Sequence, residues 1–131
     1  MFDRINYAMI VVSDMNRSVT FYRDQLGFKL RFQSEEWTEF ETGDTTLALH
    51  LTPKPPLSGT ERRKLTDRRK SAAGTVTLGL NVTNLDQAVA DLKGRGVQFV
   101  MEPTLRQKEG IRLAVFVDPD GCHITIAEHT K

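Results

Sequence analysis

The chain has 131 residues, of which 39% are hydrophobic and 27% are charged, and its formal net charge is +1. This length fits one domain with one core, and the balanced charge excludes a general preference for nucleic acid or an anionic membrane surface. No apolar run approaches the ~20 residues that span a bilayer, and a single cysteine, Cys122, excludes an intramolecular disulfide. Met1 leads directly into a strand pattern without a signal peptide, so we expect a cytoplasmic protein.

The first half of the chain predicts the order strand, helix and three further strands. Residues 5–12 are apolar and rich in β-branched side chains, which favours a strand. A helix follows as far as Gln25, with Asn16 as its cap and Leu26-Gly27 as its end. Strands are then predicted over residues 28–33, 37–41 and 45–52, with a turn at 42–44. In the first of these three strands, alternation points Phe28, Leu30 and Phe32 inward.

The second half predicts the same order. Residues 75–82 read as a strand, and a helix follows that is capped by Asn84 or Asp86 and ended by Gly94 and Gly96. Val97, Phe99 and Met101 alternate with polar or smaller residues, as in a half-buried strand. Two strands, over residues 111–117 and 122–127, complete the half. They are joined by the turn Asp118-Pro119-Asp120-Gly121, in which proline fixes one dihedral angle and glycine frees another.

The two halves are related in sequence. Residues 12–16 (VSDMN) align with residues 82–86 (VTNLD), and residues 47–51 (LALHL) align with residues 122–126 (CHITI). Such self-similarity indicates two copies of one supersecondary unit. We therefore expect a single domain of two modules, residues 1–52 and 75–131, separated by a linker over residues 53–74.

The linker is strongly basic, with seven basic and two acidic residues among positions 53–74. It is either a solvated connection or a patch that binds phosphate groups or a partner. The segment lacks aromatic side chains between its basic residues, which argues against binding of single-stranded nucleic acid.

Strand alternation predicts which side chains pack against the helices and which line the opposite face. On the packed face we expect alternate residues of the first, third and fourth strands of each module, including Ile10, Phe40, Leu49, Val76, Val115, Cys122 and Ile124. Cys122 is then an inert apolar residue, and His123 occupies a rim or solvent position. The opposite face forms the concave lining of a curved sheet. Its predicted residues are Tyr7, Met9, Trp37, His50, Thr77, Arg112, Phe116 and Thr125, a mixture of aromatic and polar groups typical of small-molecule sites.

The sequence resembles the vicinal oxygen chelate superfamily, the group of glyoxalases, bleomycin-resistance proteins and extradiol dioxygenases. The resemblance covers nearly the whole chain. It rests on three stretches, which are residues 12–28 (with Val12-Ser13-Asp14, Phe21-Tyr22 and Leu26-Gly27-Phe28), residues 80–89, and Phe116-Val117-Asp118-Pro119-Asp120-Gly121. It implies an α+β fold in which two tandem βαβββ modules form a curved mixed sheet around a cup, and it implies a homodimer.

Enzymes of this superfamily bind a divalent metal in the cup through His and Glu side chains on the first and last strands of each module. Those positions fall here on Tyr7, His50, Thr77 and Thr125. His50 is a good ligand and Tyr7 could bind a ferric ion, but threonine hydroxyls are poor donors for transition metals. The sequence therefore argues against a metal cofactor, and against glyoxalase I or extradiol dioxygenase chemistry, which needs one.

Individual side chains leave alternatives open. His50 is a hydrogen-bonding residue of a pocket, a general base that can form an acid–base pair with Tyr7, or a surviving metal ligand. Trp37 either covers apolar area at a subunit contact or stacks on a planar ligand. Arg112 is either a solvated charge, paired across the sheet with Glu39, or a clamp for an anion.

Three functions follow, in this order of preference. The first is a protein that binds a small organic molecule in the cup without the usual metal site. The second is an enzyme of the same superfamily, a lyase, isomerase or dioxygenase, that uses Tyr7 and His50 and an atypical metal if any. The third is an interaction module that acts through the basic linker. The sequence names no ligand.

Overall fold

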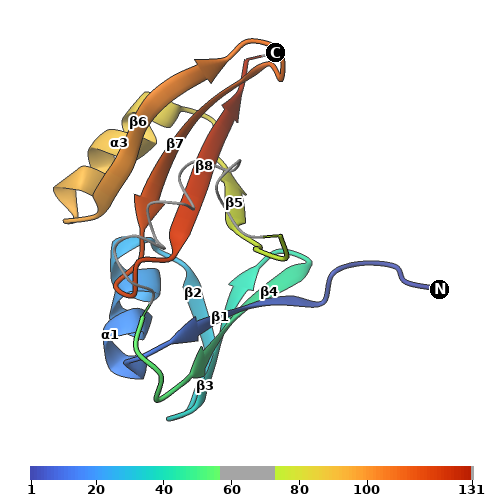
Figure 1. Cartoon of the computed structure of the whole chain (residues 1–131), viewed down its shortest axis with the longest axis vertical. Coiled ribbons are helices and arrows are strands. Elements are labelled where there is room, and N and C mark those ends of the chain that lie inside the picture. The colour runs from blue at the N-terminus through green and yellow to red at the C-terminus, as the bar shows by residue number, and fades with distance from the viewer. Residues whose placement is uncertain (57–72, 131) are drawn as a thin grey trace. The chain divides into compact units, whose positions relative to one another are not determined.

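The computed structural model describes residues 1–56 and 73–130 (Figure 1). The chain divides into two compact units, Met1–Pro56 and Leu57–Lys131. The predicted linker falls largely outside the described residues, as do the basic clusters on which the interaction-module hypothesis depends. Among the helices of the described ranges, none is long and apolar enough to span a membrane.

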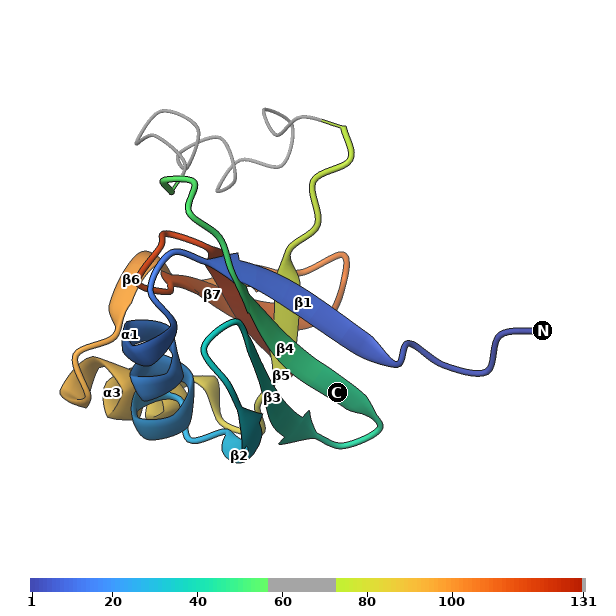
Figure 2. The same ribbon diagram turned by 90° about the horizontal axis from the view of Figure 1, so that it is seen from below.

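The first unit is a four-stranded mixed sheet with one helical segment. Its elements are β1 (Tyr7–Val12), α1 (Met15–Thr20), the π-helical turn η1 (Phe21–Gln25), β2 (Lys29–Gln33), β3 (Trp37–Thr42) and β4 (Thr45–Leu51). The strand order is β1-β4-β3-β2. β1 and β4 are parallel and run side by side, as Figure 2 shows, whereas the other pairs are antiparallel.

α1 begins one residue after its cap, Asp14. The Asp14 backbone is extended, and one of its carboxylate oxygens accepts a hydrogen bond from the Arg17 amide at 3.0 Å. The predicted cap, Asn16, is therefore wrong, and this residue lies within the first turn. Aspartate and asparagine are equally good caps, so residue type alone could not separate the two positions.

The core of the first unit lies between the helical segment and one face of the sheet. Val12, Phe40 and Leu49 on the strands are fully buried, and Tyr22 of η1 is fully buried against them, with its ring 6.1 Å from that of Phe40. Thr38 marks the same face, since its hydroxyl donates to the Met15 sulfur of α1 at 3.2 Å. Each fully buried large apolar side chain stabilises the fold by about 1.5–3 kcal/mol.

The second unit repeats this plan. Its elements are β5 (Leu78–Asn81), α3 (Leu85–Gly94), β6 (Gln98–Arg106), β7 (Ile111–Val117) and β8 (His123–His129), with the strand order β5-β8-β7-β6. β5 is parallel to β8, and the other pairs are antiparallel. Asn84 caps α3, because its side-chain oxygen accepts a hydrogen bond from the Gln87 amide at 3.0 Å. Of the two predicted caps, Asn84 and Asp86, the first is therefore confirmed.

The strand predicted over residues 75–82 is shorter than expected. Thr75, Val76 and Thr77 precede β5 and are exposed, Val76 at 89%. Val76 therefore does not pack inward as predicted. The actual strand is limited to the residues that pair with β8, from Leu78 opposite Ile124 to Asn81 opposite Ala127.

The predicted phase of β7 is wrong by one residue. Arg112 bonds to Asp86 in the first turn of α3, and its register partner Glu128 accepts from the Leu85 amide at the start of that helix. Because alternate residues share a face, Arg112, Ala114 and Phe116 lie on the helix-covered face, and Leu113, Val115 and Val117 lie on the other. Phe116 is fully buried, with its ring 5.5 Å from that of Phe99.

The turn between β7 and β8 forms as predicted. The Gly121 amide donates to the Asp118 carbonyl at 2.9 Å, and Gly121 has φ 85°, a value that L residues rarely adopt. Burial, followed by the charges of Asp118 and Asp120, raises the pKa of the Cys122 thiol to about 12, in keeping with the predicted inert cysteine. His123 is 5% exposed, so its predicted rim position is wrong.

Candidate functional site

The first unit carries a face that its helical segment does not cover, here called the open face. It is defined by alternation on β1, β4 and β3, opposite to the buried residues of the same strands. It carries Tyr7, Met9 and Val11 from β1, Thr46, Ala48 and His50 from β4, and Trp37, Glu39 and Glu41 from β3. Tyr7, Met9 and Val11 are each about half exposed (46–51%). Tyr7, Met9, Trp37 and His50 therefore share one face, as the sequence predicted.

Trp37 is the centre of an aromatic cluster on this face. Its ring centroid lies 5.8 Å from that of Tyr7, with an interplanar angle of 82°, and 6.1 Å from that of His50, with an angle of 75°. Both contacts are edge-on arrangements, which aromatic rings favour over face-to-face stacking. The cluster thus joins β1, β3 and β4, with the indole between the phenol and the imidazole.

A hydrogen-bond network orients the indole. Trp37 Nε1 donates to one oxygen of Glu39 at 2.9 Å, and the other oxygen accepts from Arg31 Nη2 at 2.9 Å and Arg31 Nε at 3.2 Å. Arg31 Nη2 also donates to the Thr46 hydroxyl. The hydrogen bond from Trp37, and then that from Arg31, hold the pKa of Glu39 below its usual value. The predicted pairing of Glu39 with Arg112 is therefore wrong.

A β-bulge brings Phe32, the neighbour of Arg31, to the open face. Leu30 is opposite Phe40 on the packed face, but Phe32 is opposite Glu39, so the register shifts between them. Such a bulge sets two residues against one and redirects the side chains that follow. Phe32 is consequently 52% exposed instead of pointing inward as predicted. The sequence did not predict this bulge because apolar and polar residues alternate regularly along the strand, and no residue type in it indicates a bulge.

Two polar groups on the open face make no hydrogen bond within the described part of the chain. These are the Tyr7 hydroxyl and the His50 imidazole, whose contacts there are the ring contacts with Trp37. Both side chains are exposed. They can therefore bond to a ligand without first breaking a bond within the protein.

The remaining predicted site residues belong to the second unit and do not form one cluster there. Thr125 lies on the uncovered face of its sheet, opposite Val115 and Gly79, and Thr77 is exposed and precedes β5. Arg112 bonds to Asp86 at 2.9 Å and lies 3.6 Å from Glu128, and Phe116 is in the core. Arg112 and Phe116 are thus on the opposite face of the sheet from the one predicted.

The residues at the four expected metal positions do not fit a transition-metal site. His50 supplies an imidazole nitrogen, Tyr7 a phenol, and Thr77 and Thr125 only neutral hydroxyls, whereas such sites use three or four imidazole, carboxylate or thiolate ligands. The Trp37 ring also contacts both the Tyr7 and His50 rings. We therefore derive no chemistry through a metal at these positions.

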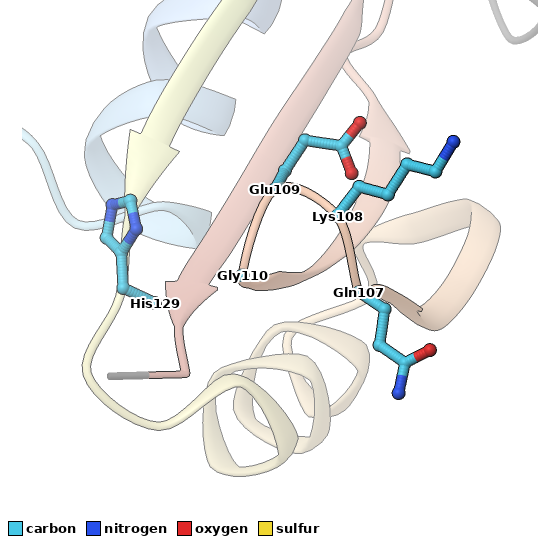
Figure 3. Close-up of a pocket in the computed structure, with 5 residues that line it drawn as sticks. All are labelled: Gln107, Lys108, Glu109, Gly110 and His129. Atoms are coloured by element: carbon cyan, nitrogen blue, oxygen red, sulfur yellow. The ribbon is translucent and has the colours of Figure 1, made fainter.

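A shallow pocket of about 340 Å³ lies in the second unit, at the hairpin between β6 and β7. It is lined by Gln107, Lys108, Glu109, Gly110 and His129. Figure 3 shows the labelled side chains of the hairpin pointing in different directions, with His129 set apart from them on β8. Polar groups that do not converge on one point cannot fix a ligand's orientation, so the open face is the stronger candidate site.

Comparisons with known proteins agree with this fold. The model of the Glyoxalase/Bleomycin resistance protein/Dioxygenase superfamily matches residues 4–126. YwkD, an uncharacterized protein of Bacillus subtilis (strain 168), is 30% identical over 132 aligned residues, with 95% of each chain covered. The crystal structure of SMU.1112c is similar with a TM-score of 0.80 at 21% identity, over 98% of this chain and 100% of that one.

A further solved structure is that of TnmS3, an antibiotic binding protein from Streptomyces sp. CB03234. It is similar with a TM-score of 0.72 at 23% identity, over 98% of this chain and 97% of that one. At such identities the structural likeness shows the fold, whereas the match over residues 4–126 shows the family. With its two βαβββ units, the chain belongs to the glyoxalase/bleomycin resistance protein/dioxygenase superfamily.

Proposed function

We propose that the open face of the first unit binds a small planar organic molecule, and that it does so without a resident metal ion. The observation that carries the proposal is the Trp37 indole, held between Tyr7 and His50 and fixed by Glu39. Preorganised aromatic side chains lose little entropy on binding and offer both apolar area and a polar edge. The antibiotic-binding relative TnmS3 gives a precedent for small-molecule binding on this fold.

The exposed rings of the open face suit a flat ligand. Ala48 lies in register between Glu39 on β3 and Met9 on β1, and it is fully buried, so the larger side chains around it cover the middle of the face. The rings of Tyr7 and Trp37 contact each other, and Phe32, in register with Glu39, is 52% exposed. A flat ligand can then rest on the exposed faces and edges of these rings.

The metal-independent part of the proposal rests on the donor set. The threonines at two of the four expected positions offer no anionic or imidazole donor, and the same positions in the first unit contact Trp37 instead. Binding by ring contacts and hydrogen bonds needs no ion. The expected result is therefore that a strong chelator leaves ligand affinity unchanged.

Fluorescence of Trp37, the single tryptophan of the chain, gives a direct assay. We expect planar bicyclic and tricyclic aromatic compounds to change its emission saturably, equally with and without EDTA. Tyr7→Leu removes one ring of the cluster and should weaken binding, whereas Phe2→Leu, at a residue 91% exposed and outside the sheet, is the matched control. Purified protein that carries stoichiometric iron, manganese, nickel or zinc, or binding that EDTA abolishes, would refute metal independence.

An enzyme that uses Tyr7 and His50 is the second candidate function. It is favoured by the two free polar groups on either side of Trp37, because a general acid and a general base must both reach the substrate. For an enzyme, His50→Ala should abolish turnover of a substrate while binding persists. For a binding protein, the same variant changes affinity only.

We further propose that the chain forms a homodimer through β1. This strand is at the edge of its sheet and exposes the apolar residues Tyr7, Met9 and Val11. An unpaired, exposed strand favours pairing with another chain. Pairing at this edge extends the sheet and leaves the open face accessible. Sedimentation equilibrium should give a dimer, and Val11→Lys should shift the mass toward a monomer.

A further inference from the structure

The carboxylates of the open face are already engaged. One oxygen of Glu39 accepts from Trp37 and the other from Arg31, and Glu41 pairs with Lys29 at 3.2 Å. The lowered pKa of Glu39 agrees with a carboxylate stabilised in its charged form. The face therefore offers a ligand few acceptors that are not already bonded.

The donors of the same face are less fully engaged. Arg31 uses Nε and Nη2 for Glu39 and Thr46, and within the described residues its Nη1 has no partner. The side chain is 43% exposed, so this edge of the guanidinium can reach a ligand. Together with Tyr7 and His50, it gives the open face free groups that donate more hydrogen bonds than they accept.

The contacts of Arg31 place its charge beside the aromatic cluster. From β2 the side chain reaches across β3 to Thr46 on β4, and Thr46 is the register partner of Tyr7 on β1. Through Glu39 the guanidinium is also joined to the Trp37 indole. A planar molecule resting on Tyr7 and Trp37 would thus have the guanidinium at its edge.

We propose that the ligand carries an acidic group at the edge of its planar ring system, and that Arg31 binds this group and determines the preference for it. The proposal rests on the proposed function of the open face. It gives to Arg31 the anion-binding role that the sequence suggested for Arg112, whose guanidinium is engaged by Asp86 and Glu128 on the other side of its own sheet. Arginine suits this role because its planar fork matches carboxylate geometry and keeps its charge.

A pair of nearly isosteric probes tests the proposal. The probes are 2-naphthoate and its neutral amide, 2-naphthamide, titrated into ¹⁵N-labelled full-length protein. The chain has one tryptophan, so one indole N–H resonance reports on Trp37. Charge-assisted hydrogen bonds are about twice as strong as neutral ones, so we expect 2-naphthoate to bind about tenfold more tightly.

Two variants that lose the same charge separate recognition from general electrostatics. Arg31→Met should reduce the preference for 2-naphthoate to about one, while Lys29→Met, on the same strand, should keep it near tenfold. Arg31→Lys keeps a charge but loses the fork, and its preference should fall between these values. If Arg31→Met fails to fold, the preference measured for Arg31→Lys still tests the role of Arg31. A full preference in Arg31→Met or Arg31→Lys, or its loss in Lys29→Met, would overturn the assignment to Arg31.

The outcomes also distinguish this inference from the function on which it rests. If both probes shift the indole resonance with equal affinity, the open face binds planar molecules but the acidic preference is wrong. If neither probe shifts the resonance, the proposed function fails and the inference fails with it.

Discussion

Replacing Phe116 by alanine tests which face of β7 is packed against the helix. Phe116 is fully buried and contacts the Phe99 ring at a centroid distance of 5.5 Å. Truncation of such a residue costs about 3–5 kcal/mol in the free energy of unfolding, of which the aromatic pair accounts for about 0.5–1.5 kcal/mol. Had Phe116 lined a ligand site, as the sequence suggested, the substitution would weaken ligand binding and change the free energy of unfolding little.

The matched control is Phe32→Ala, the same substitution at a phenylalanine that is 52% exposed. With about half of its area already in water, its loss should cost only about 1 kcal/mol. Urea unfolding followed by circular dichroism measures both variants, and an unchanged m-value would support comparison of the two free energies. If Phe116→Ala is no more destabilising than Phe32→Ala, the assignment of Phe116 to the packed face is wrong.

Three further predictions follow from local interactions. Asp14→Ala should lower stability by about 1 kcal/mol because α1 loses its cap, whereas Asn16→Ala should have little effect. A larger loss of stability in Asn16→Ala than in Asp14→Ala would show that Asn16 is the cap, as the sequence suggested. The hydrogen bond from Trp37 lowers the pKa of Glu39, so its stabilising effect is present at neutral pH and is lost as the pH falls through that lowered pKa. The indole N–H resonance should therefore titrate with a midpoint below 4.5, the ordinary pKa of glutamate, and a midpoint at or above that value would contradict the network. Desolvation above all raises the pKa of the half-buried Cys122 thiol to about 12 from an ordinary 9.0, so its contribution to stability is full below pH 9 and declines above it. Cys122→Ala should remove that part of the alkaline decline, and rapid reaction of the native thiol with a disulfide reagent at pH 8 would contradict the raised pKa.

The order of the elements was predictable because their signals are local. The helix of the second unit has a capping residue, and the turn at Asp118–Gly121 contains both proline and glycine. The phase of β4 was also predictable, since His50 is polar among leucines and marks the open face. Because the two halves are related in sequence, the order of elements inferred for one unit could also be inferred for the other.

The phase of β7 was not predictable in the same way. Of its seven residues only Arg112 is polar, so an alternating pattern cannot distinguish the two faces. A charged residue suggests the solvent side, but here Asp86 and Glu128 provide partners on the helix side. Those partners come from a helix and from another strand, and a linear sequence does not show that they meet.

The role of Arg31 was hidden for a related reason. Alternation with Leu30 already places Arg31 opposite the packed face, but its proposed function depends on Glu39, eight residues away, and on Thr46 of β4. The aromatic members of the site were found because alternation suffices to place Tyr7, Trp37 and His50 on one face. The polar network that orients them required the pairing of the strands.

A crystal structure of the protein soaked with 2-naphthoate tests the central claim most directly. We expect density for the ring system against Tyr7 and Trp37, with the carboxylate at Arg31 and no metal ion between ligand and protein. Density in the hairpin pocket of residues 107–110 and His129, with the open face of the first unit empty, would contradict it.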